Sequence, residues 1–231
     1  MFRINQRLCY ISLLFLAVFT VSCKKETVAP QTPSMNYFPT EKGRYVDYEV
    51  DSVYHAENDN NNDDSVYSYH FFVRDVIDSS YSDLQGRINQ IVLRYRRNDT
   101  LQNWALSNVW SQYLSSSSAY RTEDNVTYHK LSFPISETIT WNVNDANTLS
   151  EEDAFYEYFH ESDVINGNSF DSTLSVIQID ENNYVETIYG NEKYASGIGL
   201  IYKERKDLGK KNGIVVKGLD YKMRVVGYGR F

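Results

Sequence analysis

Metal and acid–base chemistry in this chain would depend on four histidines and one acidic segment. Residues 59–64 offer oxygen ligands of the kind that calcium binds in loops. An EF-hand loop starting at Asp59 would need glycine at its sixth position and glutamate at its twelfth, where this chain has Asp64 and His70. A looser calcium site remains an alternative to a solvated acidic loop. The histidines show no metal-ligand spacing, so we predict no metal site and no cofactor; they are His55, His70, His129 and His160.

Nucleophile and cofactor motifs are also missing from the sequence. Gly197-Ile198-Gly199 lacks the third glycine of a dinucleotide loop, and it better fits a place where a strand bends or another backbone approaches closely. No G-x-S-x-G motif occurs. Glu151 and Glu152 are neighbours, and on a strand they would point to opposite faces. We therefore predict no catalytic residue and favour a protein that is not an enzyme.

Aromatic residues are the other group with binding chemistry. Trp104, Trp110 and Trp141 accompany 20 tyrosines. Their rings could contact a ligand by stacking against a sugar or by lining an apolar cavity. The alternative is a β core that is rich in aromatic side chains.

Four short segments resemble the Asp-Ser/Thr-aliphatic/Thr acceptor of periplasmic O-glycosylation. They are Asp51-Ser52-Val53, Asp64-Ser65-Val66, Asp99-Thr100-Leu101 and Asp171-Ser172-Thr173. Only the second and third lie where exposed turns are expected, so Ser65 and Thr100 are the acceptors that we predict to be accessible.

Cys23 closes an N-terminal segment that resembles a bacterial lipoprotein signal. Arg3 and Arg7 precede an apolar run, residues 8–21, which is shorter than the roughly 20 residues of a membrane-spanning helix. The run ends at Ser22-Cys23, although Thr20 stands where the motif usually has leucine. We predict that residues 1–22 are a signal peptide and that the Cys23 thiol accepts a diacylglyceryl group. Residues 23–36 would then be a flexible tether to a domain over residues 37–231.

Composition limits what the predicted domain can bind and how it is stabilised. Removal of residues 1–22 takes away two arginines and shifts the formal charge from -8 to -10. Such an acidic chain is a poor partner for nucleic acid. Cys9 and Cys23 are the only cysteines, so the domain would contain no disulfide.

Alternation of side chains predicts an all-β domain with little helix. Residues 45–54 place Val46, Tyr48 and Val50 on one face. Residues 67–73 alternate in the same way, and the acidic residues between the two runs predict a long-looped hairpin. About ten such strands follow one another along the chain. They predict a single antiparallel barrel, half-barrel or sandwich, because an open sheet of this length would leave aggregating edges.

Two segments resemble uncharacterised cell-envelope lipoproteins of the Bacteroidota type. Residues 37–48 (YFPTEKGRYVDY) are similar to their opening, in which Phe-Pro is followed by a glycine, a tryptophan and a tyrosine, with Tyr45 in place of the tryptophan. Residues 192–204 (EKYASGIGLIYKE) are similar to their C-terminal GVGLVYKE-like strand. The resemblance implies a lipocalin-like or lipoprotein-carrier-like β fold, and it implies no activity.

Taken together, the sequence favours a lipid-anchored envelope protein, placed in the outer membrane, that binds an unknown small ligand or another envelope protein. Two alternatives remain open. One is a component that binds or processes glycans, and the other is a structural subunit whose sheet edges pair with other chains.

Overall fold

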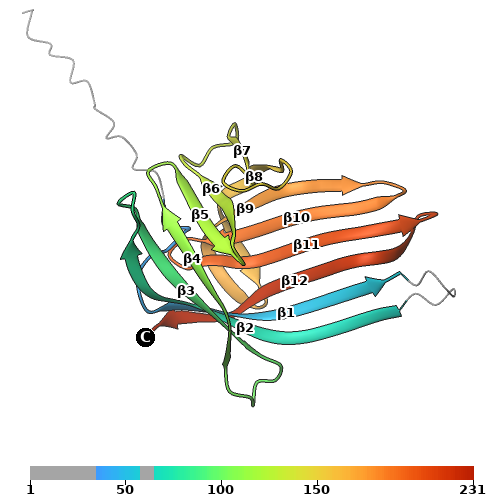
Figure 1. The fold of residues 1–231 in the computed structure, drawn as a ribbon, viewed down its shortest axis with the longest axis horizontal. Coiled ribbons are helices and arrows are strands. Elements are labelled where there is room, and N and C mark those ends of the chain that lie inside the picture. The colour runs from blue at the N-terminus through green and yellow to red at the C-terminus, as the bar shows by residue number, and fades with distance from the viewer. Residues whose placement is uncertain (1–34, 58–64) are drawn as a thin grey trace, which may run out of the picture. The chain divides into compact units, whose positions relative to one another are not determined.

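The computed structural model describes residues 35–57 and 65–231, which contain twelve β-strands and no helix (Figure 1). The predicted signal peptide, Cys23 and most of the predicted tether lie outside these residues, as does the acidic segment 59–64. The strands are β1 Arg44–Ala56, β2 Ser65–Ser82, β3 Ile88–Arg97, β4 Ala105–Leu114, β5 Ser118–Glu123, β6 Val126–Ser132, β7 Thr140–Asn142, β8 Asp153–Ile165, β9 Asn168–Asn182, β10 Glu186–Ala195, β11 Gly199–Lys211 and β12 Ile214–Arg230. The described residues include no helix long and apolar enough to cross a membrane.

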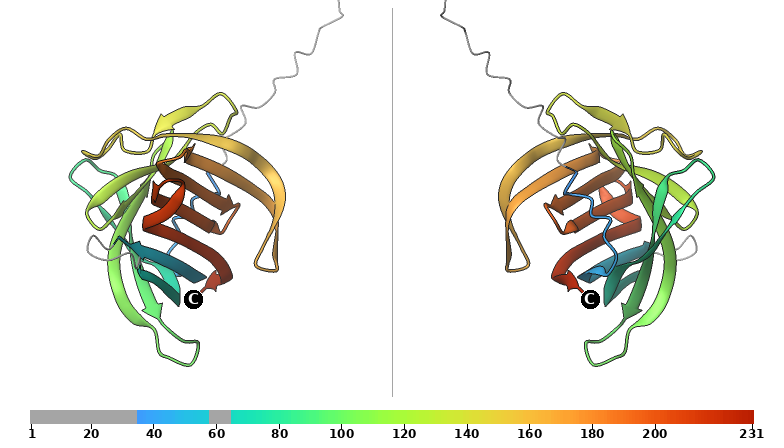
Figure 2. Two further views of the ribbon diagram at one scale, coloured as in Figure 1. Left: turned by 90° about the vertical axis from the view of Figure 1, so that its right-hand side faces the viewer. Right: turned by 90° about the vertical axis from the view of Figure 1, so that its left-hand side faces the viewer.

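All twelve strands belong to one antiparallel sheet, in the order β6-β5-β4-β3-β2-β1-β12-β11-β10-β9-β8-β7. The first and last strands of the chain pair with each other, from Arg44 opposite Arg230 to His55 opposite Gly218. The sheet curls on itself (Figure 2), and its two edge strands approach at a seam where the His129 amide donates to the Val143 carbonyl at 2.8 Å. The all-β, antiparallel, barrel-like prediction is therefore confirmed.

The predicted hairpin between residues 45–54 and 67–73 is also confirmed. Tyr48 lies opposite Val73, Val50 opposite Phe71, and Tyr54 opposite Tyr67. Val50 and Val73 are buried, so the apolar face that alternation predicts is the inner face of the curl.

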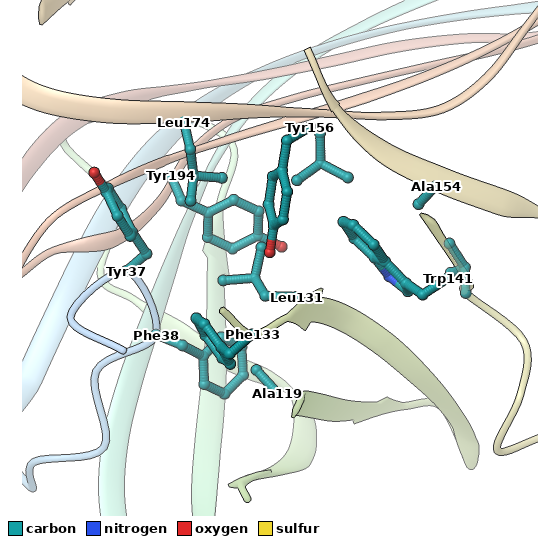
Figure 3. Packing of buried hydrophobic residues seen from close by; sticks show 12 residues of the cluster. Tyr37, Phe38, Ala119, Leu131, Phe133, Trp141, Ala154, Tyr156, Leu174 and Tyr194 are labelled. Atoms are coloured by element: carbon teal, nitrogen blue, oxygen red, sulfur yellow. The ribbon is translucent and has the colours of Figure 1, made fainter. Parts of the chain in front are cut away.

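A short segment before β1 closes one end of the curled sheet. Tyr37 and Phe38 are buried in the larger of two apolar clusters, where Figure 3 shows Phe38 beside Phe133. Backbone bonds hold the segment in place, because the Asn36 carbonyl accepts from the Gly197 amide at 2.8 Å. The other members of this cluster include Trp141, Tyr156, Leu174 and Tyr194.

The backbone around Gly197 and Gly199 behaves as the sequence predicts. Gly199 has a φ of 99°, and a Cβ atom there would lie 3.1 Å from the ring of Pro39. Glycine at this position therefore allows the closing segment to approach the start of β11.

Six strands continue beyond the closed part of the curl. β3 pairs with β2 only from Phe72 onward, and β8 pairs with β9 only as far as Ile177. The distal parts of β9, β10, β11, β12, β1 and β2 therefore project as an open sheet, at the right of Figure 1. We call this part the projecting sheet.

Candidate functional site

Ion pairs lie among the apolar clusters in the interior of the curl. Lys130 Nζ lies 3.0 Å from Glu192 Oε1 and 3.2 Å from Glu123 Oε1. Lys203 Nζ lies 3.1 Å from the same Glu192 oxygen. Glu192 is fully buried, and the Tyr194 hydroxyl donates to its other oxygen at 2.5 Å. We call Glu123, Lys130, Glu192 and Lys203 the ionic cluster.

The ionic cluster keeps its carboxyl groups ionised despite their burial. Burial alone would raise the pKa of Glu192, but the ammonium groups of Lys130 and Lys203 outweigh it and hold that pKa well below its ordinary value. The same balance lowers the pKa of Glu123 to about 2. For Lys203, burial acts to lower the pKa, whereas Glu123 and Glu192 raise it above its ordinary value.

A second ionic group, with members on β2, β3 and β5, also lies in the interior. Arg94 donates to both carboxylate oxygens of Asp75, at 2.7 and 2.8 Å, and its guanidinium lies 3.9 Å from the ring centroid of Trp110. Arg121 contacts Asp75 at 3.4 Å and donates to Gln112 at 2.6 Å. A hollow of about 30 Å³ nearby has room for one or two waters.

Tyrosine side chains extend this inner face onto the projecting sheet. Residues directly opposite each other in antiparallel strands point to the same face. One row runs Asp207, Leu219, Tyr54, Tyr67 across β11, β12, β1 and β2. The next row runs Arg205, Tyr221, Ser52, Tyr69, and the one after it runs Lys203, Met223, Val50, Phe71. The tyrosines and Lys203 of the ionic cluster therefore share one continuous face.

Three of these tyrosines are half-exposed. The exposed fractions are 48% for Tyr54, 48% for Tyr67 and 51% for Tyr69. Tyr67 and Tyr69 are two residues apart on β2, which places them about 7 Å apart along the strand. We call Tyr54, Tyr67 and Tyr69 the tyrosine row.

Two hollows border the tyrosine row and the ionic cluster. The outer hollow has a volume of about 590 Å³, and its lining includes Tyr54, Glu186, Arg205, Asp207, Lys217 and Leu219. The inner hollow has a volume of about 260 Å³, and its lining includes Glu123, Lys130, Glu152, Gln178, Lys203 and Arg205. Arg205 lines both hollows and donates to the two carboxylate oxygens of Glu152 at 2.9 and 3.0 Å. The two hollows are thus adjacent parts of one site.

This arrangement can bind a ligand through ring stacking and hydrogen bonds. The aromatic faces of the tyrosine row are accessible, and charged or amide groups that both donate and accept hydrogen bonds line the hollows. Sequence reasoning did not single out these residues as a site. The signal that could have found them is the alternation of Tyr67, Tyr69 and Phe71 with Ser68 and His70.

His129 and His160 take structural roles, whereas His55 lines the outer hollow and His70 lies exposed, 2.9 Å from Asp51. Both ring nitrogens of His129 are occupied, by Asp145 at 2.9 Å and by the Leu131 carbonyl at 3.0 Å. His160 bonds with the hydroxyl of Tyr37. No group of three or more His, Cys, Asp or Glu side chains in residues 35–57 and 65–231 is placed to hold a metal ion.

The three tryptophans lie in separate surroundings, and none lines either hollow. Trp104 stacks against Arg74 and Arg97, whereas Trp110 is buried under Arg94. Trp141 is buried against Tyr156, as Figure 3 shows.

Of the two predicted glycosylation acceptors, Ser65 begins β2 and Thr100 lies in the turn between β3 and β4. Both residues are exposed, and their modification stays a prediction.

Comparisons with known proteins yield only distant similarity in structure. No family model matches the chain, and no curated protein matches it. A crystal structure of a "putative lipoprotein" from Parabacteroides distasonis is similar with a TM-score of 0.43 and 11% sequence identity. A crystal structure of a "putative exported protein with YmcC-like fold" from Bacteroides fragilis has a TM-score of 0.46 and 12% identity. Each alignment covers 84% of this chain and 98% of the other.

Proposed function

We propose that this protein binds a glycan, without catalysis, on the inner face of the projecting sheet. The observation that carries the proposal is the tyrosine row, which borders the outer hollow at Tyr54, with Arg205 and Asp207 on the same face of β11, across β12 from β1. A sugar ring has an apolar C–H face that packs on an aromatic ring and a rim of hydroxyl groups that need donors and acceptors. The half-exposed tyrosines and the charged groups of the hollow meet both needs.

The same residues disfavour a lipid or another wholly apolar ligand. The exposed Asp207 carboxylate makes no ion pair with another described residue, and covering it with hydrocarbon would remove its water without a replacement. The inner hollow is also lined largely by charged side chains. A hydroxyl-rich ligand can replace the lost water bonds at both places.

Substitution of the tyrosine row tests the proposal. We expect Tyr67→Ala and Tyr69→Ala each to weaken oligosaccharide binding about 5- to 10-fold, because each loses roughly 1 kcal/mol of stacking. The measurement is titration calorimetry of the full chain in detergent with a panel of soluble neutral and acidic oligosaccharides. Tyr81→Ala is the matched control, since Tyr81 lies on the same strand with 46% exposure but far from both hollows.

Two results would contradict the proposal. If no oligosaccharide of the panel binds, the protein is not a glycan-binding protein of this kind. If sugars bind but Tyr67→Ala and Tyr69→Ala match Tyr81→Ala, the site is elsewhere.

The N-terminal sequence supports a place in the cell envelope, with Cys23 as the lipidated residue and the outer membrane as the expected location. Radiolabelled palmitate should enter the wild-type chain and Cys9→Ala, but not Cys23→Ala. Equal labelling of the wild type and Cys23→Ala would remove the lipid anchor from the proposal.

A further inference from the structure

One edge of the projecting sheet is open to another strand. Residues 65–71 of β2 pair with β1 on one side, from Ser65 opposite Ala56 to Phe71 opposite Val50. On the other side, β3 joins only at Phe72, so within the part of the chain that the structure describes no strand pairs there. In Figure 1 this part of β2 forms the lower border of the projecting sheet. Edge strands of this kind present unpaired N–H and C=O groups to solvent.

The β8 edge, near the other end of the twelve-strand sheet, shows how this protein protects an edge. β7 covers β8 only over residues 153–155. The rest of β8 carries three irregularities in its register with β9 and a left-handed residue, His160, with a φ of 60°. Its exposed acidic side chains are Glu157 and Glu161. Bulges and charges of this type block pairing with another chain.

The β2 edge has none of these protections. Its register with β1 has no irregularity, and residues 65–71 include no Asp, Glu, Lys, Arg or Pro. All of residues 65–70 are exposed. A regular and uncharged edge is unusual in a chain with a formal charge of -8, and it is suited to pairing with another strand.

We propose that this edge pairs with the same edge of a second copy of the chain. Antiparallel pairing about a two-fold axis at Ser68 places Ser68 opposite Ser68 of the second copy. It also places Tyr67 opposite Tyr69 of the second copy, and the reverse, so that two cross-strand aromatic pairs form. The segment complements itself: it contains no Asp, Glu, Lys or Arg, and His70 falls opposite Val66 of the second copy, so the contact brings together no like charges although the two chains are acidic.

Pairing of this kind joins the binding faces of the two copies. The two-fold axis is perpendicular to the sheet, so the inner faces of both copies lie on the same side. Tyr67 and Tyr69 of each copy then form one continuous aromatic surface of four rings across the junction. The second copy thus lengthens the proposed glycan site, although the pairing itself does not depend on glycan binding.

A single cysteine at the axis tests the pairing. Directly opposed residues have Cα atoms about 4.5–5.5 Å apart, which a disulfide spans. The full chain with Ser68→Cys, oxidised in the cell envelope, is expected to give a dimer on a non-reducing gel. Ser80→Cys is the matched control, because Ser80 is exposed on the same strand but lies opposite Gln90 of β3. No dimer with Ser68→Cys, or equal dimer with Ser80→Cys, would overturn the proposal.

Two variants that carry opposite charges at position 68 distinguish this pairing from other contacts between two copies. Ser68→Lys and Ser68→Asp each place like charges on the axis, so each variant alone should sediment as a monomer where the wild type is a dimer. Mixed in equal amounts, the two should again form dimers. A monomeric wild type, or two variants that each remain dimeric, would refute the β2 pairing. Oligosaccharide binding to the monomeric variants, with weaker affinity, would show that the proposed function survives without the second copy.

Discussion

Replacing Glu192 with glutamine should lower the free energy of unfolding by about 3–5 kcal/mol. Glu192 is fully buried, and its carboxylate lies within 3.1 Å of the ammonium groups of both Lys130 and Lys203. Glutamine keeps the volume but removes the charge, which leaves two ammonium groups beside Glu123 alone. The measurement is equilibrium denaturation of the full chain in urea.

A surface ion pair provides the control for this substitution. Glu41 pairs with Arg44 at 2.7 Å, and half of the Glu41 side chain is exposed. We expect Glu41→Gln to change the unfolding free energy by less than about 1 kcal/mol. If Glu192→Gln has an effect as small as this, the ionic cluster does not hold the interior together.

The pH dependence of the unfolding free energy is a second measurement of how much the ionic cluster contributes to stability. The folded-state pKa values of Glu123 and Glu192 are lowered, so the unfolded chain binds more protons than the folded chain as the pH falls below about 5. The stability from these groups is complete above their ordinary pKa of 4.5 and is lost as the pH falls toward about 2, the folded-state pKa of Glu123. The wild type should therefore lose stability over this range, and Glu192→Gln should lose less because one of the two groups no longer titrates.

The sequence could not reveal the ionic cluster, for a physical reason. Alternation assigns charged residues on strands to the solvent face, and it therefore treats Lys130 and Lys203 as surface residues. Each is tolerated inside only because distant residues neutralise it, and Lys130 lies 62 positions from Glu192. Contacts over such separations leave no local pattern.

Strand β5 is hard to predict from the sequence for the same reason. Its six residues direct Arg121 and Glu123 inward, so polar side chains stand where alternation expects apolar ones. It also begins at Ser118, the last residue of the serine run 115–118, whose composition is typical of a loop. By contrast, β1 and β2 were predicted well because their inner positions are apolar or aromatic.

The tyrosine row could be predicted only in part: the sequence predicts which face these side chains share, but not how exposed they are. Alternation correctly places Tyr67 and Tyr69 on the same face of β2 as Val73. Val73 is buried, however, whereas the two tyrosine side chains are half-exposed. The difference arises because β3 ends opposite Phe72, and the length of a neighbouring strand cannot be read from β2 itself. The pattern therefore predicts which side chains share a face, whereas tertiary pairing decides which of them remain accessible.

Replacing Tyr37 with alanine should lower the free energy of unfolding by about 3–5 kcal/mol. Tyr37 is fully buried in the apolar cluster, and its hydroxyl makes hydrogen bonds with His160 Nδ1 at 2.8 Å and Ser172 Oγ at 2.7 Å. The alanine variant loses both the ring and these bonds. Tyr37→Phe keeps the ring, and we expect it to cost only about 1 kcal/mol, because the partners that lose a bond, exposed His160 and half-buried Ser172, can bond to water instead. Urea denaturation measures both variants.

The comparison between the two Tyr37 variants tests whether the segment before β1 is needed to close this end of the curled sheet. Residues before β1 usually belong to a mobile terminus, yet here Tyr37 and Phe38 close the end of a curled sheet whose own strands leave it open. If packing of the ring closes this end, Tyr37→Ala should also expose the backbone near Asn36 to limited proteolysis, and Tyr37→Phe should not. Equal stability of Tyr37→Ala and the exposed-tyrosine variant Tyr81→Ala would mean that the segment docks on a barrel that is already stable. The seam between β6 and β7 would then close without it.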